Sequence, residues 1–432
     1  MSVATWQASD LEFAQALECV LGRAAMVRVP ETERVALLDS AWRVLAEAVT
    51  ADRDQPPFDR ATRDGFAVRA AEWSGGRRLR VVGQVRAGEV WLGDAIRAGE
   101  AVEIMTGAPL PKGADAVAMM ERTEQVEGEV RAATGRKLRA EENLVWRGSE
   151  GRRGEVLLAV GTPLGAAEIA LAAACGYAKI AVHKRPSVAI MATGDELVEL
   201  DVVPESHQIR DSNGYALAAL VAASGGKAKR LEIARDSKES LRKRIVDGRQ
   251  SDLLLLSGGV SVGKYDLVEE VLSEFGAEFF FTRVKMQPGR PVVFGRMPKA
   301  ASQRVSKSAS KRVHEAKDEW TYFFGLPGNP VSTQVTFHCF VGPMLRAICG
   351  TSPAQWGPRF VQATLAEKVK GKDGLTRFLP GILRHDLERP EVRLVLSHGS
   401  GDLAANARAN CYAVLPDGRD LRAGDVITVL LR

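Results

Sequence analysis

The sequence predicts a multidomain α/β protein built around a parallel sheet. Three apolar runs, at 187–191, 253–256 and 322–324, each lead into a glycine-containing loop and then a plausible helix. Continuously apolar strands that alternate with helices are typical of a parallel sheet covered on both faces. The length of 432 residues suggests two to four domains, at roughly 100–200 residues per domain.

The N-terminal residues predict two helices. The first runs from about Ser9 to Arg23, and the second carries apolar residues three or four positions apart between Val35 and Val49. A proline pair at 56–57 then stops helical structure. From residue 58 the sequence pattern changes to short β-like runs between Gly and Pro turns. This pattern predicts a small β-rich domain inserted between helical segments.

The rest of the chain divides into an α/β region and a second β-rich region. The runs Val292–Phe294 and Tyr322–Phe324 should pair or neighbour in the sheet, although 298–319 separates them. We expect 298–319 to be a flexible surface excursion, and the alternative is a basic arm that attracts anions. The expected domains are 1–57 with 141–184 (helical and extended, domain I), 58–140 (β-rich, domain II), 185–350 (α/β, domain III) and 351–432 (small β domain IV).

Composition excludes several classes of protein. The net charge of +5 is too weak a bias to indicate nucleic acid binding. The longest apolar stretch, Ile169–Val182, is too short and interrupted to span a bilayer, and no signal peptide is visible, so a cytoplasmic location is expected. Five cysteines without a Cys-x-x-Cys pair and six scattered histidines argue against zinc, so any metal should be a hard cation held by carboxylates.

The loop 257–266 is the most informative segment. Its small residues let backbone N–H groups approach an anion, and the following helix directs its positive end to the same place. A phosphate is the natural ligand, and Asp266 sits where a carboxylate could hold a divalent ion. The alternative is a tight turn between strand and helix without a ligand.

Acidic residues follow three of the predicted strands. Asp195 and Glu196 come after the first strand, and Asp236 follows a predicted strand at 231–234. Taken singly, each is explained by a stabilising position near a helix N-terminus. Because parallel strands end at one edge of a sheet, the acids together could share a cation.

Other loops suggest an oxyanion site. The segments 288–291 and 326–330 contain several prolines, and stiff loops lose little entropy when they bind a small rigid anion. Arg290 and Ser332 could donate hydrogen bonds there. Asp64 and Thr106 lie in turn-like segments of the β-rich region.

As a set, these motifs resemble the MoeA-type molybdopterin molybdenumtransferases, the family that includes the gephyrin E domain. They occur in the family's order and cover nearly the whole chain. The matching segments are 58–59 with 64–68, 104–109, 142–143, 147–148, 193–197, 257–263 with Asp266, 288–291 and 325–332.

The resemblance implies a molybdopterin-binding, MoaB/MogA-like domain III, a small C-terminal β-barrel and an elongated homodimer. It places the active site between the sheet of one subunit and the β-rich domain of the other. It implies that molybdate is inserted into adenylylated molybdopterin with release of AMP, and that Mg²⁺ is the cofactor. Further partners would be the molybdopterin adenylyltransferase and molybdoenzyme chaperones.

The resemblance also implies site residues. The catalytic set is Asp64, Thr106, Glu196, Asp236 and Asp266. The set for adenylylated molybdopterin is Thr193, Gly194, Asp195, Ser257, Gly258, Gly259, Ser261 and Gly263. The molybdate set is Pro288, Gly289, Arg290, Pro327, Asn329, Pro330, Ser332 and Ser400. The Mg²⁺ ligands are Asp195, Asp236 and Asp266.

The chain departs from the family where basic residues are common, because Val145, Gln287 and Leu375 stand there instead. Each lost charge weakens the local argument for anion binding, and Arg60, Arg63, Lys285 and Arg290 could compensate. Two other readings stay open, a molybdopterin adenylyltransferase and a non-catalytic scaffold. The residues do not predict whether molybdate or tungstate is bound, since both are tetrahedral dianions of similar size.

Overall fold

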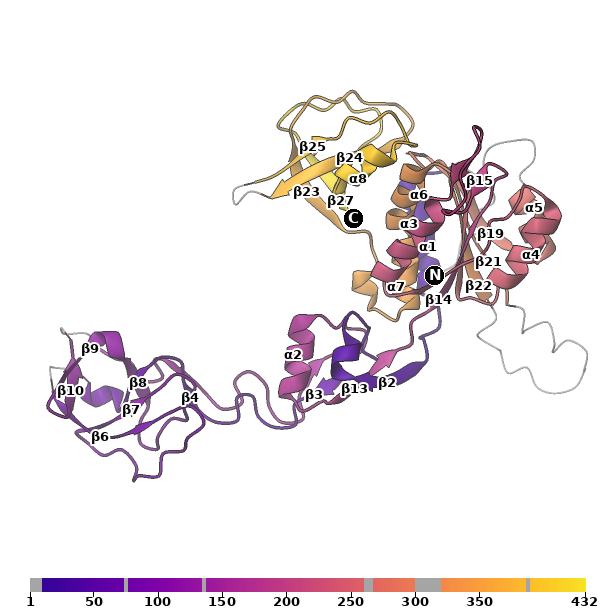
Figure 1. Ribbon diagram of the computed structural model, residues 1–432. Coiled ribbons are helices and arrows are strands. Elements are labelled where there is room, and N and C mark those ends of the chain that lie inside the picture. The colour runs from indigo at the N-terminus through magenta and orange to yellow at the C-terminus, as the bar shows by residue number, and fades with distance from the viewer. Residues whose placement is uncertain (1–9, 74–76, 134–136, 260–266, 300–319, 386–388) are drawn as a thin grey trace, which may run out of the picture.

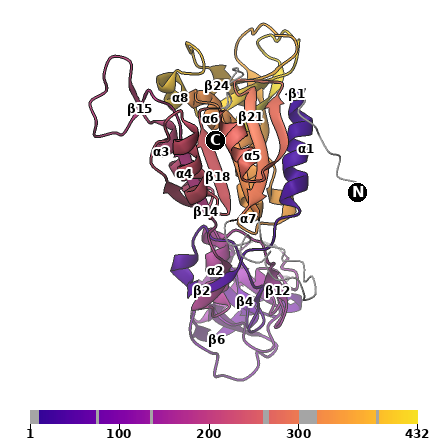
Figure 2. The same ribbon diagram turned by 90° about the vertical axis from the view of Figure 1, so that its right-hand side faces the viewer.

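The computed structural model of the protein describes residues 10–73, 77–133, 137–259, 267–299, 320–385 and 389–432. Ser9, Ser261, Gly263, Asp266 and residues 300–319 of the predicted insertion lie outside the described residues. Figures 1 and 2 show a large sheet with helices and a C-terminal barrel at one end of the molecule. A β-rich region lies at the other end, and a connecting region lies between them (Figure 1).

The large sheet has seven strands in the order β1-β19-β21-β22-β18-β14-β17. The strands β22, β18, β14 and β17 run parallel, as predicted, but β21 is antiparallel to both of its neighbours. The expected pairing of the runs on either side of 298–319 is confirmed by β21 and β22. The strands are β1 (Asp10–Leu11), β14 (Ser187–Ala192), β17 (Lys227–Arg230), β18 (Leu253–Ser257), β19 (Glu278–Val284), β21 (Pro291–Pro298) and β22 (Trp320–Leu326).

Helices cover both faces of this sheet (Figure 2). On one face Val20 of α1 and Leu217 of α3 share a core with Val188 and Leu255 of the strands. On the other face Leu241 of α4 packs with the alternate strand residues. The helices are α1 (Phe13–Ala24), α3 (Asn213–Ala223), α4 (Lys238–Gly248), α5 (Leu267–Glu274), α6 (Pro330–Thr336) and α7 (Gly342–Ile348), with a π-helical turn (Phe337–Val341) between the last two.

The first helix forms as predicted but packs in a different place. Sequence analysis grouped it with the residues up to 57, whereas α1 lies on the large sheet beside β19. The reason is that β1 pairs in parallel with β19 just before the helix begins, with Leu11 opposite Val284. This pairing delivers the apolar stripe of α1 to the core of the sheet.

The second predicted helix, at 35–49, is wrong. Its residues instead hydrogen-bond to a segment more than a hundred positions away: the Trp42 amide donates to the Leu164 carbonyl at 2.8 Å and the Leu45 amide to the Thr162 carbonyl at 2.9 Å. These backbone contacts bury Leu45 and Val49, whereas Leu38 and Trp42, which helical spacing would have put on the same face, stay exposed. The connecting region contains β2 (Thr32–Ala36), a 3₁₀ turn (Leu37–Ser40), β3 (Val49–Thr50), β12 (Val156–Leu158), α2 (Ala166–Ala174) and β13 (Lys179–His183). The paired strands β4 (Arg60–Ala61) and β11 (Leu144–Val145) lie in the β-rich region, where Ala61 and Leu144 pack against its core (Figure 1).

The β-rich region is a six-stranded sheet in the order β8-β5-β7-β6-β10-β9. Alternate residues of its strands fill two apolar clusters, one on each face, because side chains of a strand point to opposite sides. Its elements are β5 (Gly65–Val68), β6 (Leu79–Val85), β7 (Glu100–Ile104), β8 (Ala116–Met119), β9 (Thr123–Val126) and β10 (Glu129–Ala132), with 3₁₀ turns at Ala70–Glu72 and Met120–Arg122.

The C-terminal residues form a small closed β-barrel. Six strands follow the order β20-β24-β25-β23-β27-β26, and β24 also pairs with β26 to close it. The strand β20 comes from the sheet domain, so it ties the loop at 287–290 to the barrel. The elements are β20 (Met286–Gln287), a 3₁₀ turn (Pro353–Gln355), β23 (Phe360–Leu365), β24 (Thr376–His385), β25 (Pro390–Leu394), α8 (Leu403–Arg408), β26 (Cys411–Leu415) and β27 (Val426–Leu431). Among the described residues, no helix has the length and apolar character needed to cross a membrane.

Candidate functional site

Three loops meet where the parallel strands β14, β18 and β22 end. The Thr193 amide donates to the Ser257 carbonyl at 3.0 Å, and the Gly258 amide donates to the Leu326 carbonyl at 3.1 Å. Thr193 and Ser257 are buried. The convergence predicted for this edge of the sheet is therefore present, and it is where α/β sheets bind ligands.

The loop after β18 needs glycine at its first turn. Gly258 has φ +94°, and a Cβ atom there would lie 2.5 Å from the Thr193 carbonyl oxygen. Only glycine tolerates both this conformation and this approach. The backbone of the loop is thus held directly against the end of β14.

Two carboxylates adjoin this loop. The Thr193 hydroxyl donates to Asp236 Oδ1 at 2.9 Å, and the Asp236 amide donates to Asp195 Oδ1 at 3.2 Å. Both side chains are exposed, so oxygens remain available to a ligand. Glu196 lies at the same corner, because its Oε2 would be 2.5 Å from a Cβ on Gly194.

The route to Asp236 differs from the prediction. The strand expected at 231–234 is wrong, since β17 ends at Arg230. A single parallel bridge between Ala234 and Thr193 brings the chain to the sheet edge instead. Asp236 still lies at the sheet edge, because one backbone contact, rather than a full strand, is enough to position its carboxylate.

These carboxylates fit a magnesium ion. Mg²⁺ is commonly held by one or two carboxylates, with substrate phosphates and water as the other ligands. Asp195 and Asp236 provide such a pair, and Asp266 lies outside the described residues. Within the described ranges no group of three acidic, histidine or cysteine side chains forms an all-protein metal cage.

Asn213 is a site residue that sequence analysis missed. Its Nδ2 donates to Ser257 Oγ at 2.9 Å and to the Gly328 carbonyl at 2.7 Å, so it ties together the loops after β18 and β22. The local signal was the polar Asp211-Ser212-Asn213 run before an apolar helix. Asp211 acts as the anchor of that run, because its Oδ1 accepts from the Gly214 amide at 2.8 Å.

The proline-rich loop after β22 is rigidly held. The Thr333 hydroxyl donates to the Pro327 carbonyl at 2.6 Å, and the Thr333 amide donates to the Asn329 carbonyl at 3.0 Å. Pro330 starts α6, where its missing N–H costs nothing. The Val331 amide donates to the Ser400 carbonyl at 3.0 Å, which brings Ser400 of the barrel to this loop.

The loop at 288–290 lies against the same helix. A Cβ on Gly289 would be 2.6 Å from Thr336 Cγ2, one turn along α6 from the buried Ser332. Arg290 is ion-paired with Asp10. The structure therefore brings Pro288, Gly289 and Ser332 together with the loop after β22.

Charge near this loop comes from a residue that sequence analysis did not name. Lys372 of the barrel donates from Nζ to Gln287 Oε1 at 3.2 Å, where the expected basic residue is missing. Two residues considered as compensation are already paired, Lys285 with Glu12 at 2.6 Å and Arg60 with Glu150 at 3.0 Å. The sequence could not indicate Lys372, because the position of this residue beside Gln287 depends on the pairing of β20 with β24.

Asp64 and Thr106 meet each other but not the sheet edge. Both the amide and the hydroxyl of Thr106 donate to Asp64 Oδ1, at 2.6 and 2.7 Å. These two hydrogen bonds stabilise the ionised form and lower the pKa of Asp64. The pair lies in the β-rich region, which is separate from the large sheet (Figure 1).

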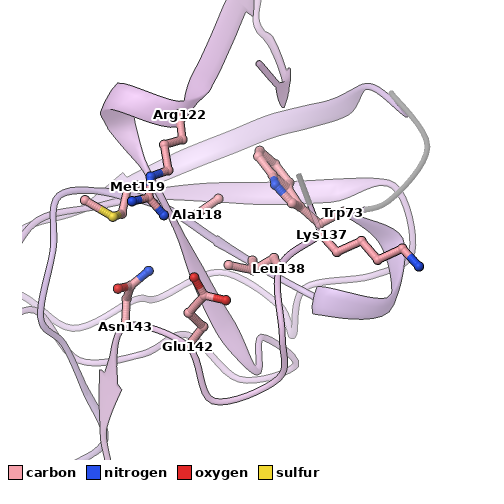
Figure 3. A pocket seen from close by; sticks show the side chains of 8 residues that line it. All are labelled: Trp73, Ala118, Met119, Arg122, Lys137, Leu138, Glu142 and Asn143. Atoms are coloured by element: carbon pink, nitrogen blue, oxygen red, sulfur yellow. The ribbon is translucent and has the colours of Figure 1, made fainter. Parts of the chain in front are cut away.

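A small pocket of the β-rich region is lined by two more motif residues, Glu142 and Asn143. Figure 3 shows Glu142 and Asn143 facing Trp73, Leu138 and Arg122 around it. Its volume is about 20 Å³, enough for one water molecule. Asn143 donates from Nδ2 to the Val117 carbonyl at 2.8 Å, so it fastens the chain beside Asp64 rather than binding a ligand.

Comparisons with known proteins cover nearly the whole chain. Family models match for the "MoeA N-terminal region (domain I and II)" at 11–176, the "Probable molybdopterin binding domain" at 189–347 and the "MoeA C-terminal region (domain IV)" at 362–431. A molybdopterin molybdenumtransferase of Staphylococcus aureus is 33% identical over 92% of this chain and 90% of its own length. One of Nostoc sp. is 33% identical over 93% and 88%.

The solved structures agree with these matches. A molybdopterin biosynthesis MoeA protein from Pyrococcus horikoshii superimposes with a TM-score of 0.67 and 30% identity, covering 98% of this chain and 99% of that one. A second structure of that description reaches a TM-score of 0.74 at 24% identity, over 98% and 100%. The likeness extends over all the regions described above.

Proposed function

Because the chain belongs to the MoeA family of molybdopterin molybdenumtransferases, we propose that it inserts molybdate into adenylylated molybdopterin with magnesium-dependent release of AMP. One observation carries the proposal: a glycine loop, paired carboxylates and a stiff proline loop meet at one edge of one sheet. The loop that begins at Gly258 would bind the phosphate of the substrate, and Thr193 and Ser257 border this loop. The loops at 288–290 and 327–332, with Ser400 and Lys372, suit the oxyanion.

Magnesium would be held by Asp195 and Asp236, with Asp266 as the third proposed ligand. When bound, the ion supplies positive charge that neutralises phosphate oxygens. The chain's own contribution is to orient Asp236, which the Thr193 hydroxyl fixes through Oδ1 while Oδ2 stays open. Glu196, which lies beside Gly194, would accept a proton from an attacking water.

The active unit is proposed to be a homodimer. Asp64 and Thr106 form an ordered polar pair in a region separate from the sheet edge, which supports a site completed by a second chain (Figure 1). A second subunit would bring its own Asp64 and Thr106 to the cleft. In the cytoplasm, the molybdopterin adenylyltransferase would supply the substrate and molybdoenzyme chaperones would take the product.

The test is to give the purified chain adenylylated molybdopterin, molybdate and Mg²⁺. We expect AMP release that depends on molybdate, and a product that activates a molybdenum-free apoenzyme. Formation of adenylylated molybdopterin from ATP would instead indicate an adenylyltransferase. Binding without AMP release would indicate a scaffold, and either outcome would overturn the proposal.

A further inference from the structure

A second cavity lies at the opposite end of the large sheet. It has a volume of about 350 Å³, within the range of roughly 300–1,000 Å³ that is typical of ligand pockets. Its walls come from the entry to β14, the end of α3 and the helix α7, together with residues of the connecting region and the barrel. In Figure 2 this junction lies where α7 and the start of β14 meet the region of β2 and α2. Six residues of β14, at about 3.3 Å each, put it roughly 20 Å from Thr193.

The cavity is strongly basic. No aspartate or glutamate occurs among its lining residues, all of which belong to the described chain. Burial and repulsion from Arg359 lower the pKa of Arg346 to about 10. Two of the other cations are ion-paired with glutamates outside the lining, Arg43 with Glu33 and Lys184 with Glu31 at 2.8 Å. The cationic side chains that line it are Arg43, Lys184, Arg185, Arg346, Arg359 and Arg432.

Some of these cations are held in place and others are free. Arg346 donates to the Trp356 carbonyl at 2.6 Å and to the Gly357 carbonyl at 2.8 Å, neutral groups that fix the guanidinium without cancelling its charge. Arg185 and Arg359 are exposed, and their guanidinium groups have no hydrogen bond or ion pair among the described residues. Two unpaired guanidinium groups beside the fixed charge of Arg346 are an arrangement that suits a phosphate.

Unpartnered buried atoms point to the same conclusion. His183 is 4% exposed, and its Nδ1 lies 3.3 Å from the Pro30 carbonyl, but its Nε2 has no partner within the described ranges. His338 Nε2, in the same lining, is likewise buried and without a partner there. A buried polar atom without a partner is destabilising, and a ligand with a protonated oxygen would satisfy it.

The remaining wall is apolar. Trp42 is 77% exposed at the cavity, although large aromatic side chains are usually covered, and Leu220 and Leu431 also line it. Trp42 also has φ +62°, an uncommon conformation for a bulky residue. We propose that this cavity is a second anion site, which binds a small phosphate ester by its phosphate at the arginines and by a flat organic group against Trp42.

The test uses the full-length chain and the fluorescence of Trp42, with the Trp42→Phe chain as background. Inorganic phosphate and phenyl phosphate are the probes. We expect a saturable Trp42-dependent change with both, and tighter binding of phenyl phosphate because only its ring reaches the apolar wall. A signal without saturation, or equal affinity for the two probes, would overturn the proposal.

Charge reversal identifies the phosphate-binding groups. Arg185→Glu with Arg359→Glu should weaken phenyl phosphate binding on the order of tenfold or more, because charged hydrogen bonds are lost. The matched control, Arg77→Glu with Arg384→Glu, changes two exposed arginines elsewhere and should bind like the wild type. Equal weakening in both variants would indicate attraction to surface charge only and would overturn the site.

Two further measurements serve as controls for the binding experiments. Thermal unfolding checks the fold of each variant, and the single changes Arg185→Gln and Arg359→Gln replace the double variant if it fails to fold. A Trp42 signal that depends on protein concentration without any probe would show that a second copy of the chain fills the cavity. That outcome would also overturn the proposal.

Discussion

The two parts of the candidate site, the sheet edge and the Asp64–Thr106 pair, are held in different ways. At the sheet edge, Asn213 and Thr193 connect loops that are distant in sequence through short hydrogen bonds, and Thr333 fastens the proline-rich loop to its own helix. In the β-rich region, Asp64 and Thr106 are bonded to each other and remain exposed. One part is rigid within a single chain, whereas the other needs a further surface opposite it.

This difference separates the roles of the two parts. Parallel strands end at a common edge, so a rigid network there can hold a phosphate and a cation in fixed positions. An exposed carboxylate on a separate region can approach or leave the cleft with that region as a whole. The contrast predicts that removing a hydrogen bond between the loops of the sheet edge lowers stability more than a change at Asp64 or Thr106 does.

The largest effect is expected from Asp236→Asn. The change removes a charge but keeps the shape of the side chain and its hydrogen bond from Thr193, so the fold should survive. AMP release should fall on the order of 10²–10³-fold, as when a charge-stabilising group is lost. The exposed Asp201→Asn is the matched control, and wild-type turnover by Asp236→Asn would remove this acid from the site.

Mixing two inactive chains tests whether the two parts of the site come from different subunits. Asp64→Ala and Asp236→Ala should each abolish AMP release as homodimers. A heterodimer of the two has one intact site and should regain about half of the wild-type rate, since C₂ dimers contain two equivalent sites. Verified heterodimers that stay inactive would show that each site is built from a single chain.

Asn213→Ala should affect stability more than any change at Asp64. The buried Ser257 hydroxyl and the carbonyl of the exposed Gly328 would lose their shared donor, and the unsatisfied Ser257 hydroxyl should cost about 1–3 kcal/mol. Urea unfolding measures this loss, and the KM for adenylylated molybdopterin should rise because two loops are released. Ser212→Ala, with no cap hydrogen bond to lose, serves as control. An unchanged unfolding midpoint in Asn213→Ala would contradict the bridging role.

The smallest effect concerns pH. Thr106 lowers the pKa of Asp64 below its ordinary value of 3.8, so the pair stabilises the fold above that pH and the contribution disappears as pH falls through the lowered pKa. Thr106→Val removes one donor, so its stability deficit should be present near neutral pH and shrink below 3.8. Thr106→Ser keeps the hydroxyl and should show no deficit. A deficit independent of pH would indicate packing instead of charge.

Local patterns predicted much of the sheet and its edge. The runs at 187–191, 253–256 and 322–324 became β14, β18 and β22 because each is apolar on both faces and ends at a glycine or proline loop. The same logic failed at 35–49, where helical spacing coincided with residues that pair with a distant segment. Asn213 was missed because its partners, Ser257 and Gly328, lie 44 and 115 positions away.

Sequence therefore specified the residue chemistry and the strands that carry it, because apolar runs, glycines and prolines act over a few neighbouring positions. Tertiary structure specified which of these residues meet. The bond from Lys372 to Gln287, the contact of Ser400 with α6 and the basic cavity beside Trp42 all join segments from different regions. No local pattern encodes such meetings, because they depend on how whole sheets and helices pack.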